Sequence, residues 1–244
     1  MIGKVSAAVV RHRHVVLMLG LLVAGVNAAA VGFVPTLGQW LFLPLLLLTL
    51  AILVLALITM GIRPACFVVQ RQIPAFATPA PAWKVLLALG ILGHVSASIG
   101  ALVRSTRQGI VSTVDVVPSV LWFVLAALLL VEAWRGYNVA LHPHGVRQSW
   151  ALGSVTVPWE AIPAAQIPPG ADRPSRLRLT FAQPQLVRRR GISWGRKALR
   201  TDNVDAGFLA AAIGHYVRHG EHRAAIGSQA EYERLLAELP ERAG

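Results

Sequence analysis

Two kinds of hydrophobic pattern divide the chain near residue 135. Before that point, apolar residues form four long runs, at residues 15–34, 40–60, 85–103 and 116–134. A helix needs roughly 20 mostly apolar residues to cross the hydrocarbon core of a bilayer. The only fully charged residue inside these runs is Glu132, which lies near an end. The pattern therefore predicts an α-helical domain of four transmembrane helices over residues 1–135.

The first run also has features of a cleaved signal peptide. Lys4, Arg11 and Arg13 precede it, and small residues follow Asn27, as at a cleavage site. Cleavage would leave three spans and a different topology. The apolar run nevertheless continues to Val34, which favours a retained helix.

After residue 135 the pattern becomes short and alternating. "YNVALHPHGVRQSW" predicts a hairpin that turns at Gly145, and "GSVTVP" predicts a strand. "SRLRLTFA" places Leu177 and Leu179 on one face and arginines on the other, and "QLVRRRGISW" is compatible with a further strand. These segments predict several antiparallel strands.

Two amphipathic helices are expected after the strands. Asp202 or Asn203 would cap the first, which carries an apolar stripe and ends at Gly220. Ser228 with Glu231 forms a capping-box pattern for a shorter second helix. The C-terminal part is therefore expected to be an α+β domain.

The segment "LHPHGVRQSWALGSVTVPWEAIPAAQI" resembles the opening of a bacterial pleckstrin-homology-like (PH-like) domain. In that family a strand ends at a Gly turn and a later strand carries a Trp, an acid and an Ile, as Trp159, Glu160 and Ile162 do here. The tail "DNVDAGFLAAAIGHYVRHGEHRAAIGSQAEYERL" resembles the closing helix and the segment after it. The resemblance covers about residues 137–235.

This resemblance implies antiparallel β-sheets capped by a helix, and it implies no single activity. We therefore expect a PH-like domain at residues 136–225, followed by a short amphipathic helix and tail at 226–244. Trp159 and Ile162 should help close its core, and Glu160 should point to solvent or tie down a turn.

Composition agrees with a membrane protein. Hydrophobic residues make up 55 % and charged residues 14 % of the 244 residues, and the net charge is +12. Residues 1–135 hold nine Lys/Arg and two acids, whereas residues 136–244 hold fourteen and nine. A basic chain suits a membrane whose cytoplasmic face is anionic. The single cysteine, Cys66, excludes an intrachain disulfide.

Basic residues near the spans predict the orientation. Seven fall on one side if the N-terminus is inside, and two, Arg104 and Arg107, fall on the other. The seven are Lys4, Arg11, Arg13, Arg63, Arg71, Lys84 and Arg135. We therefore expect a multi-pass protein of the inner (cell) membrane with both termini in the cytoplasm. The loop of residues 63–83 contains four prolines and is expected to be irregular.

Polar residues inside the spans are the first candidate site. Asn27 lies in the first span and His94 in the third, among small residues that let helices approach closely. The simpler interpretation is packing, with both side chains in interhelical hydrogen bonds. The alternative is a proton relay or ligand contact in a small transporter or channel regulated by the basic domain.

A basic segment is the second candidate site. It could be a solvated face near anionic inner-leaflet lipid, or a specific site for lipid headgroups or a partner protein. Without a reader motif, nucleic acid is not expected. The segment has nine basic residues and no acid: Arg173, Arg176, Arg178, Arg188, Arg189, Arg190, Arg196, Lys197 and Arg200.

Neither an enzyme, a metal site nor a cofactor is expected. The sequence has no recognisable nucleophile, phosphate-loop or zinc motif. His215, His219 and His222 would share a face on a continuous helix, but a break at Gly220 would make them a solvated helix end. The leading hypothesis is a non-enzymatic membrane protein that presents a binding or scaffold module to a partner protein, another copy of itself or anionic lipid.

Overall fold

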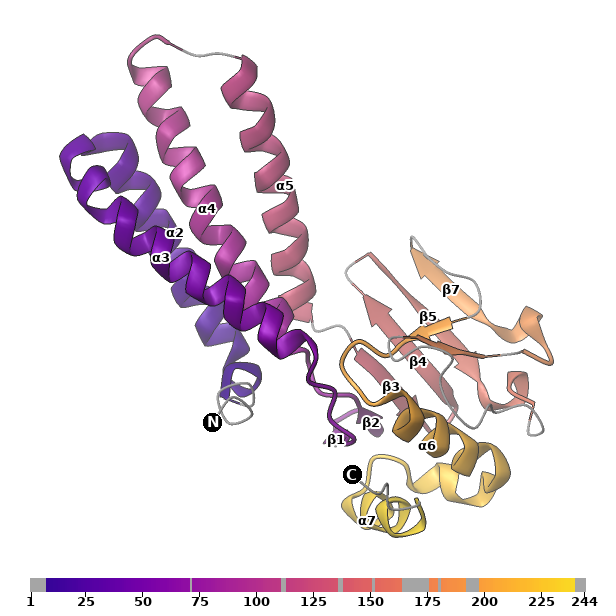
Figure 1. The fold of residues 1–244 in the computed structure, drawn as a ribbon. Helices are drawn as coiled ribbons and strands as arrows, with labels where there is room; N and C mark the ends of the chain where they lie inside the picture. The colour runs from indigo at the N-terminus through magenta and orange to yellow at the C-terminus, as the bar shows by residue number, and fades with distance from the viewer. Residues whose placement is uncertain are drawn as a thin grey trace. The chain divides into compact units, whose positions relative to one another are not determined.

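The chain forms two compact units in a computed structural model that describes residues 8–70, 72–110, 113–135, 138–150, 152–163, 176–179, 181–191 and 198–239. One unit comprises Met1–Gly61 and Pro81–Arg135, and the other Ile62–Ala80 and Gly136–Gly244. The second unit is therefore assembled from two separate pieces of sequence (Figure 1).

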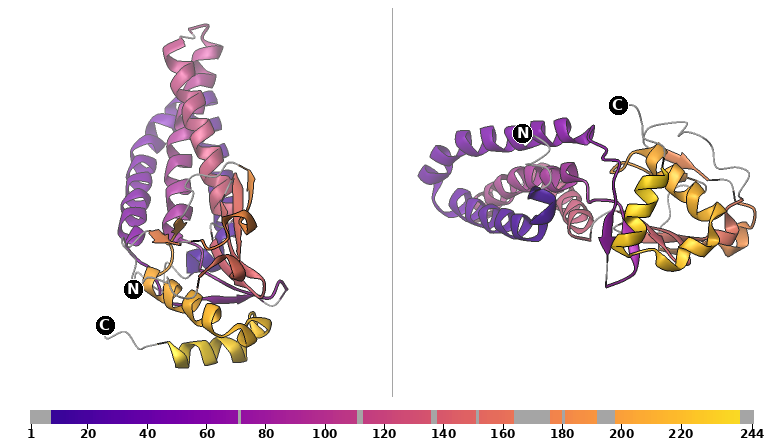
Figure 2. Two further views of the ribbon diagram at one scale, coloured as in Figure 1. Left: turned by 90° about the vertical axis from the view of Figure 1, so that its right-hand side faces the viewer. Right: turned by 90° about the horizontal axis from the view of Figure 1, so that it is seen from below.

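The first unit is a bundle of long apolar helices. They are α2 (Arg13–Phe33), α3 (Pro35–Met60), α4 (Ala82–Arg107) and α5 (Thr113–Arg135). All four are long and apolar enough to cross a membrane, which confirms the four predicted runs. Large apolar side chains of α3 and α5, such as Trp40 and Leu121, are exposed, as lipid-facing residues would be. Helix α4 packs against each of the other three (Figures 1 and 2). These helices indicate a membrane-embedded protein.

Small residues let α4 approach its neighbours closely, as predicted. A Cβ atom added at Gly100 would lie 2.6 Å from Cβ of Val31 and 2.8 Å from the carbonyl oxygen of Ala28, both on α2. Gly93 is equally close to Thr49 on α3. Glycine is required at these crossings because a larger residue would separate the helices.

The second unit contains a six-stranded antiparallel sheet of order β1-β2-β3-β4-β5-β7 and a two-stranded sheet of β6 and β8. The strands are β1 (Val68–Gln70), β2 (Ala75–Ala77), β3 (Asn138–His142), β4 (Gly145–Trp150), β5 (Gly153–Pro158), β6 (Arg176–Arg178), β7 (Arg188–Gly191) and β8 (Ala198–Arg200). The hairpin at Gly145 is confirmed, and this glycine has a φ of 148°, which side chains disfavour.

The loop of residues 63–83, expected to be irregular, instead contains β1 and β2. Strand β2 pairs with β3, where Phe76 lies opposite Leu141. The expectation was wrong because each strand has only three residues and its partner β3 comes about sixty residues later in the chain. A strand this short has no local alternation that sequence inspection can detect.

Helices cover the core of the second unit. They are α6 (Ala206–Arg218), the 3₁₀ helix η4 (Gly220–Ala225) and α7 (Gln229–Glu238). The N-cap of α6 is Asp205, which accepts a hydrogen bond from the Phe208 amide, and not the expected Asp202 or Asn203. Asn203 instead bonds to Thr78 and to the Pro79 carbonyl.

The hydrophobic core of the second unit contains the residues predicted from the sequence and extends beyond residue 225. Trp159 and Ile162 are buried and Glu160 is exposed, as expected. The Trp159 indole donates to the carbonyls of residues 142 and 143. Ile226 and Leu235, beyond residue 225, are buried in the same core. The structure does not identify the antiparallel sheets and their helices as a PH-like domain.

Candidate functional site

Asn27 connects two helices inside the membrane unit. Its amide donates to the hydroxyl of Ser96 on α4 over 2.7 Å, and both residues are buried. This confirms Asn27 as an interhelical hydrogen-bond donor. His94 instead contacts the edge of the Trp122 ring, at 4.8 Å between ring centroids. Among the described residues no hydrogen bond to the His94 ring nitrogens is present, so its role as an interhelical hydrogen-bond partner stays a prediction.

Asn27 and His94 nevertheless line one half-open pocket of about 90 Å³ between α2, α3 and α4. Thr49 and Gly93 also border it, and its remaining lining is apolar. The side-chain carbonyl oxygen of Asn27, Oδ1, is buried and has no hydrogen-bond partner among the described atoms. A buried polar atom without a partner is costly, and water in a cavity of this size can supply one.

A charged pair joins α4 and α5 in the same unit. The Lys84 ammonium lies 3.0 Å from a carboxylate oxygen of Glu132. The Lys84 side chain is 6 % exposed and that of Glu132 30 % exposed. The sequence showed both charges at span ends but not that they form a pair, because nothing in the sequence specifies how α4 and α5 are aligned.

The structure places only part of the predicted basic segment. Arg188, Arg189 and Arg190 lie on β7, where they are exposed. Arg176, Arg178 and Arg200 lie on β6 and β8, where only the backbone is described. The other predicted site residues, Arg173, Arg196 and Lys197, lie outside the described residues, as do Lys4 and Arg71.

Strand register gathers three arginines on one side of the large sheet. Arg147 on β4 lies opposite Thr156 on β5, which lies opposite Arg188 on β7. Paired residues project from the same side, as do residues two apart, so Arg190 shares that side. The neighbouring Val157 is buried in the core, so the arginines face away from it.

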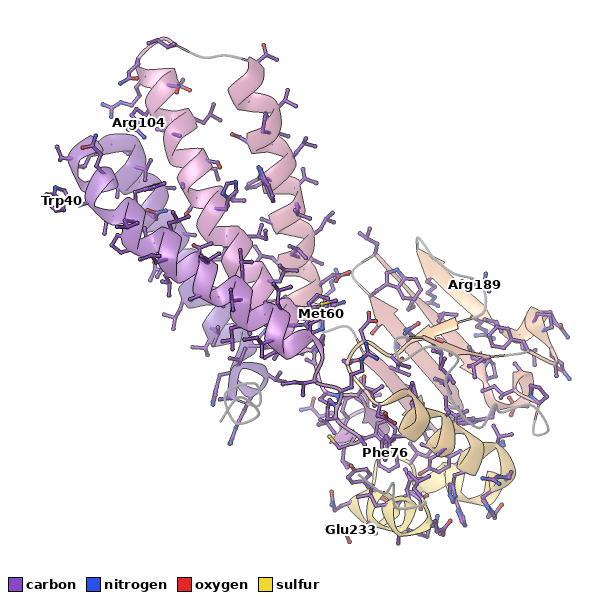
Figure 3. The ribbon with its side chains drawn as sticks, in the orientation of Figure 1. Trp40, Met60, Phe76, Arg104, Arg189 and Glu233 are labelled. Atoms are coloured by element: carbon purple, nitrogen blue, oxygen red, sulfur yellow. The ribbon has the colours of Figure 1, made fainter. Side chains whose placement is uncertain are left out.

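We call Arg147, Arg188 and Arg190 the arginine face. All three residues are exposed, and within the described part of the chain no carboxylate pairs with any of them. Figure 3 marks Arg189, which alternates to the other side of β7. Arg147 was missed because it lies outside the basic segment and only cross-strand pairing brings it to Arg188.

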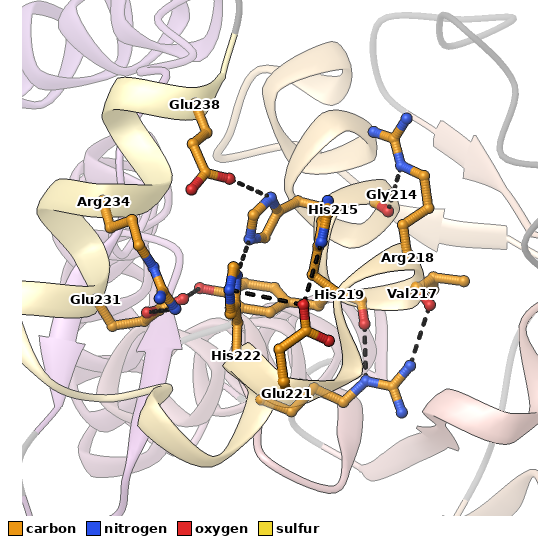
Figure 4. Close-up of polar contacts among 12 residues, drawn as sticks. Gly214, His215, Val217, Arg218, His219, Glu221, His222, Glu231, Arg234 and Glu238 are labelled. Atoms are coloured by element: carbon orange, nitrogen blue, oxygen red, sulfur yellow. Dashed lines mark hydrogen bonds and ion pairs between the residues drawn. The ribbon is translucent and has the colours of Figure 1, made fainter.

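Three histidines converge at the C-terminal end of α6. Ring centroids of His215, His219 and His222 are 4.9 to 5.3 Å apart. Helix α6 does end before Gly220, as expected, but η4 turns back and returns His222 to His215 (Figure 4). The break at Gly220 therefore does not leave the three histidines as a simple solvated helix end, because the reversal of the chain brings them together. We call them the histidine cluster.

Carboxylates surround the histidine cluster. Glu238 lies 3.1 Å from His215 Nδ1, and His215 Nε2 lies 3.1 Å from His222 Nδ1. On the other side, Glu221 Oε1 lies 3.3 Å from His219 Nδ1 and 3.7 Å from His222 Nε2. Burial is the main cause that lowers the pKa of His215, and the Glu238 carboxylate acts in the opposite direction.

The adjoining Glu231 is already bonded. It accepts a hydrogen bond from the Tyr216 hydroxyl over 3.0 Å and forms an ion pair with Arg234. Burial, followed by the nearby Glu231 charge, raises the pKa of the Tyr216 hydroxyl. The predicted capping box is half formed: the Ser228 hydroxyl accepts from the Glu231 amide, while the Glu231 carboxylate points to Tyr216.

Comparison of the chain with known proteins gave no match to a protein family, to a curated protein or to a solved structure.

Proposed function

We propose that the protein is a non-enzymatic, membrane-anchored binding protein whose second unit, a PH-like module, binds anionic lipid headgroups. The observation that carries the proposal is the arginine face, three exposed arginines without a carboxylate partner among the described residues. The hairpin at Gly145, the buried Trp159 and the covering helix α6 support the PH-like assignment.

The magnitude of the attraction favours lipid as the ligand. Each basic residue near an anionic membrane surface contributes about 1 kcal/mol, so three contribute about 3 kcal/mol. This is weaker than a 1 mM dissociation constant, which corresponds to about 4 kcal/mol. A free domain would therefore hardly bind, whereas a domain tethered to the same membrane has an effective concentration in the millimolar range.

The test uses the full chain in nanodiscs of anionic or purely zwitterionic lipid. Hydrogen exchange of peptides from β4, β5 and β7 should be slower with anionic lipid, and high salt should abolish the difference. Charge reversal of the arginine face (R147E, R188E and R190E together) should also abolish the difference between the two lipids. The matched control R218E, which changes an exposed arginine on α6, should leave the difference unchanged. Equal exchange in the two lipids would reject the proposal.

A protein partner is the alternative ligand of the same module. In the described sheet, β7 is the last strand in the order, and an edge strand can pair with an extended peptide. Crosslinking in the native membrane would decide between lipid and a partner protein. A partner protein is favoured if a crosslinked protein is lost from the R147E/R188E/R190E variant while hydrogen exchange of the wild type is the same in anionic and zwitterionic lipid. Another copy of this chain is one such partner.

The orientation forms part of the proposal, with both termini and the second unit in the cytoplasm. Because β2 pairs with β3, residues 62–80 and the C-terminal part must lie on the same side of the membrane. Cys66 lies in that segment. An impermeant thiol reagent should not label it in intact cells, and labelling there would overturn the orientation.

A second candidate function belongs to the helices. The cavity beside Asn27 and His94 has room for several water molecules and borders an unpartnered carbonyl oxygen, as a small polar solute would require. If the helices conduct, N27A or H94F should abolish flux into liposomes without lowering the protein level. Normal flux in both variants would reject this function.

A further inference from the structure

We propose that His219, Glu221 and His222 bind one divalent transition-metal ion of the zinc class. Each of the three residues offers a ligand atom within 4.8 Å of the other two, and Glu221 Oε1 lies closest to His219 Nδ1 and His222 Nε2. Two imidazole nitrogens and one carboxylate oxygen form a donor set that suits zinc, with a fourth position left open. This site lies apart from the arginine face and does not depend on the proposed function.

The spacing of these atoms fits a tetrahedral ion. Zinc bonds of about 2.0–2.1 Å place neighbouring ligand atoms about 3.4 Å apart. The Glu221 oxygen lies 3.3 Å from the His219 nitrogen and 3.7 Å from the His222 nitrogen. The side chains of His219 and Glu221 are 46 % and 67 % exposed, so small rotations of free side chains can complete the site.

The ring of His222 is held from its second nitrogen. His222 Nδ1 lies 3.1 Å from His215 Nε2, and His215 Nδ1 lies 3.1 Å from a carboxylate oxygen of Glu238. The Glu238 carboxylate accepts, which favours a proton on His215 Nδ1 and leaves His215 Nε2 to accept from His222 Nδ1. In that arrangement the lone pair of His222 lies on Nε2, the atom 3.7 Å from Glu221 Oε1. Metal-binding histidines commonly have the second ring nitrogen held in this way.

The turn that carries His222 is also held in place. Arg223 donates to the carbonyls of Tyr216 and Val217 at the end of α6, at 2.7 and 3.2 Å. The same guanidinium lies over the buried Trp159 ring, 5.5 Å from its centroid. The packing of η4 against α6 therefore does not depend on a metal ion, and the backbone of the site is preorganised before an ion binds.

A competing set of ligands is less suitable. His215, His222 and Glu231 also lie close enough together to hold an ion. However, Glu231 is already bonded to Tyr216 and Arg234, and an ion there would have to break both contacts. The exposed set needs to break no contact to a buried group. We therefore assign His215 and Glu238 as positioning residues.

The test is zinc titration of the full chain in detergent, purified through a tag that contains no histidine. One Zn²⁺ should bind per chain and raise the melting temperature, because the ion binds only the folded state. H219A, H222A and E221Q should each weaken or abolish binding. H144A removes an exposed histidine elsewhere in the unit and should leave affinity unchanged.

The positioning residue gives an independent readout. E238Q keeps all three ligands but weakens the hydrogen bond to His215, and loss of such support typically lowers metal affinity by 10- to 100-fold. The absorption of bound Co²⁺ should show tetrahedral coordination in the wild type. Absence of saturable Zn²⁺ binding, or equal binding in H219A and H222A, would overturn the site. Wild-type affinity in E238Q would overturn the role of Glu238.

Discussion

The Asn203 side-chain amide donates to the Thr78 hydroxyl over 2.9 Å, although 125 residues separate the two along the chain. The same hydroxyl accepts a hydrogen bond from the Val139 amide over 3.0 Å, and both contacts are buried. Thr78 therefore joins the segment between the second and third spans to β3 and to the start of α6. The second unit depends on this segment.

Replacement of Thr78 with valine should destabilise the second unit. The change keeps the shape but removes the acceptor of the buried Val139 amide and one of the hydrogen bonds of the Asn203 amide, and a buried group left unsatisfied costs about 1–3 kcal/mol. Urea or thermal unfolding of the full chain in detergent measures the effect. Thr156→Val, the same change at a half-buried position on the side of β5 that faces away from the core, is the control and should have a smaller effect.

A fragment of residues 136–244 should not fold alone. It lacks β1 and β2 and the buried rings of Phe67 and Phe76. Restoring residues 62–80 in front of residue 136 through a short glycine-rich linker should recover a cooperative unfolding transition, because β2 and β3 are adjacent antiparallel strands. Amide NMR dispersion and urea unfolding measure both. A well-dispersed spectrum from the fragment alone would contradict this expectation.

Leucine at Gly100 should loosen the pair α2 and α4. A side chain there meets Val31 and the Ala28 carbonyl, and overpacking of this kind typically costs about 1–3 kcal/mol. Gly25 provides the matched control, because a Cβ atom there has nothing within 4 Å. Thermal unfolding in detergent should therefore show a lower midpoint for G100L than for G25L, and equal midpoints would argue against this close contact.

The pair Lys84 and Glu132 predicts a non-additive double mutant. Removal of one partner of a fully buried pair costs about 3–5 kcal/mol, and less is expected here because Glu132 is 30 % exposed. E132L leaves the Lys84 charge buried, whereas K84M/E132L removes both charges. The double variant should unfold at a higher temperature than E132L. The opposite order would show that Lys84 stabilises the protein through contacts other than Glu132.

His142 should make stability depend on pH. Burial lowers its pKa first, and Arg147 and His144 lower it further, against a hydrogen bond to the Pro74 carbonyl that raises it. The folded state therefore disfavours protonation of His142. The stability that the neutral His142 ring contributes is complete above about pH 6.5, the ordinary pKa of histidine, and is lost as the pH falls below it.

The variant H142Q isolates this effect from the other histidines. The difference in melting temperature between wild type and H142Q should become less favourable to the wild type as the pH falls from 7.5 to 5. A constant difference across that range would exclude His142 as the source.

Features with a local signal could be predicted from the sequence. The four spans follow from run length and apolarity, and the hairpin follows from alternation on either side of Gly145. Burial of Trp159 and Ile162 follows from their place in a β pattern. Each of these inferences used residues within one short window.

Features that depend on pairing between distant residues could not be predicted. Strands β1 and β2 have three residues each, and β3 completes them from beyond two transmembrane helices. The arginine face needs the register of three strands to bring Arg147 to Arg188. The histidine cluster needs the reversal of the chain at η4, which the helix-breaking effect of Gly220 alone does not specify.

The split sheet also sets an order of events during synthesis. Phe76 leaves the ribosome 65 residues before its partner Leu141, and α4 and α5 lie between them. At roughly 5–20 residues per second, the first hairpin waits about 3–13 s with an open edge. The sheet closes only after both helices have been made. Because α4 and α5 are each long and apolar enough to span a bilayer, pairing of β2 with β3 requires that the two helices cross it together or not at all.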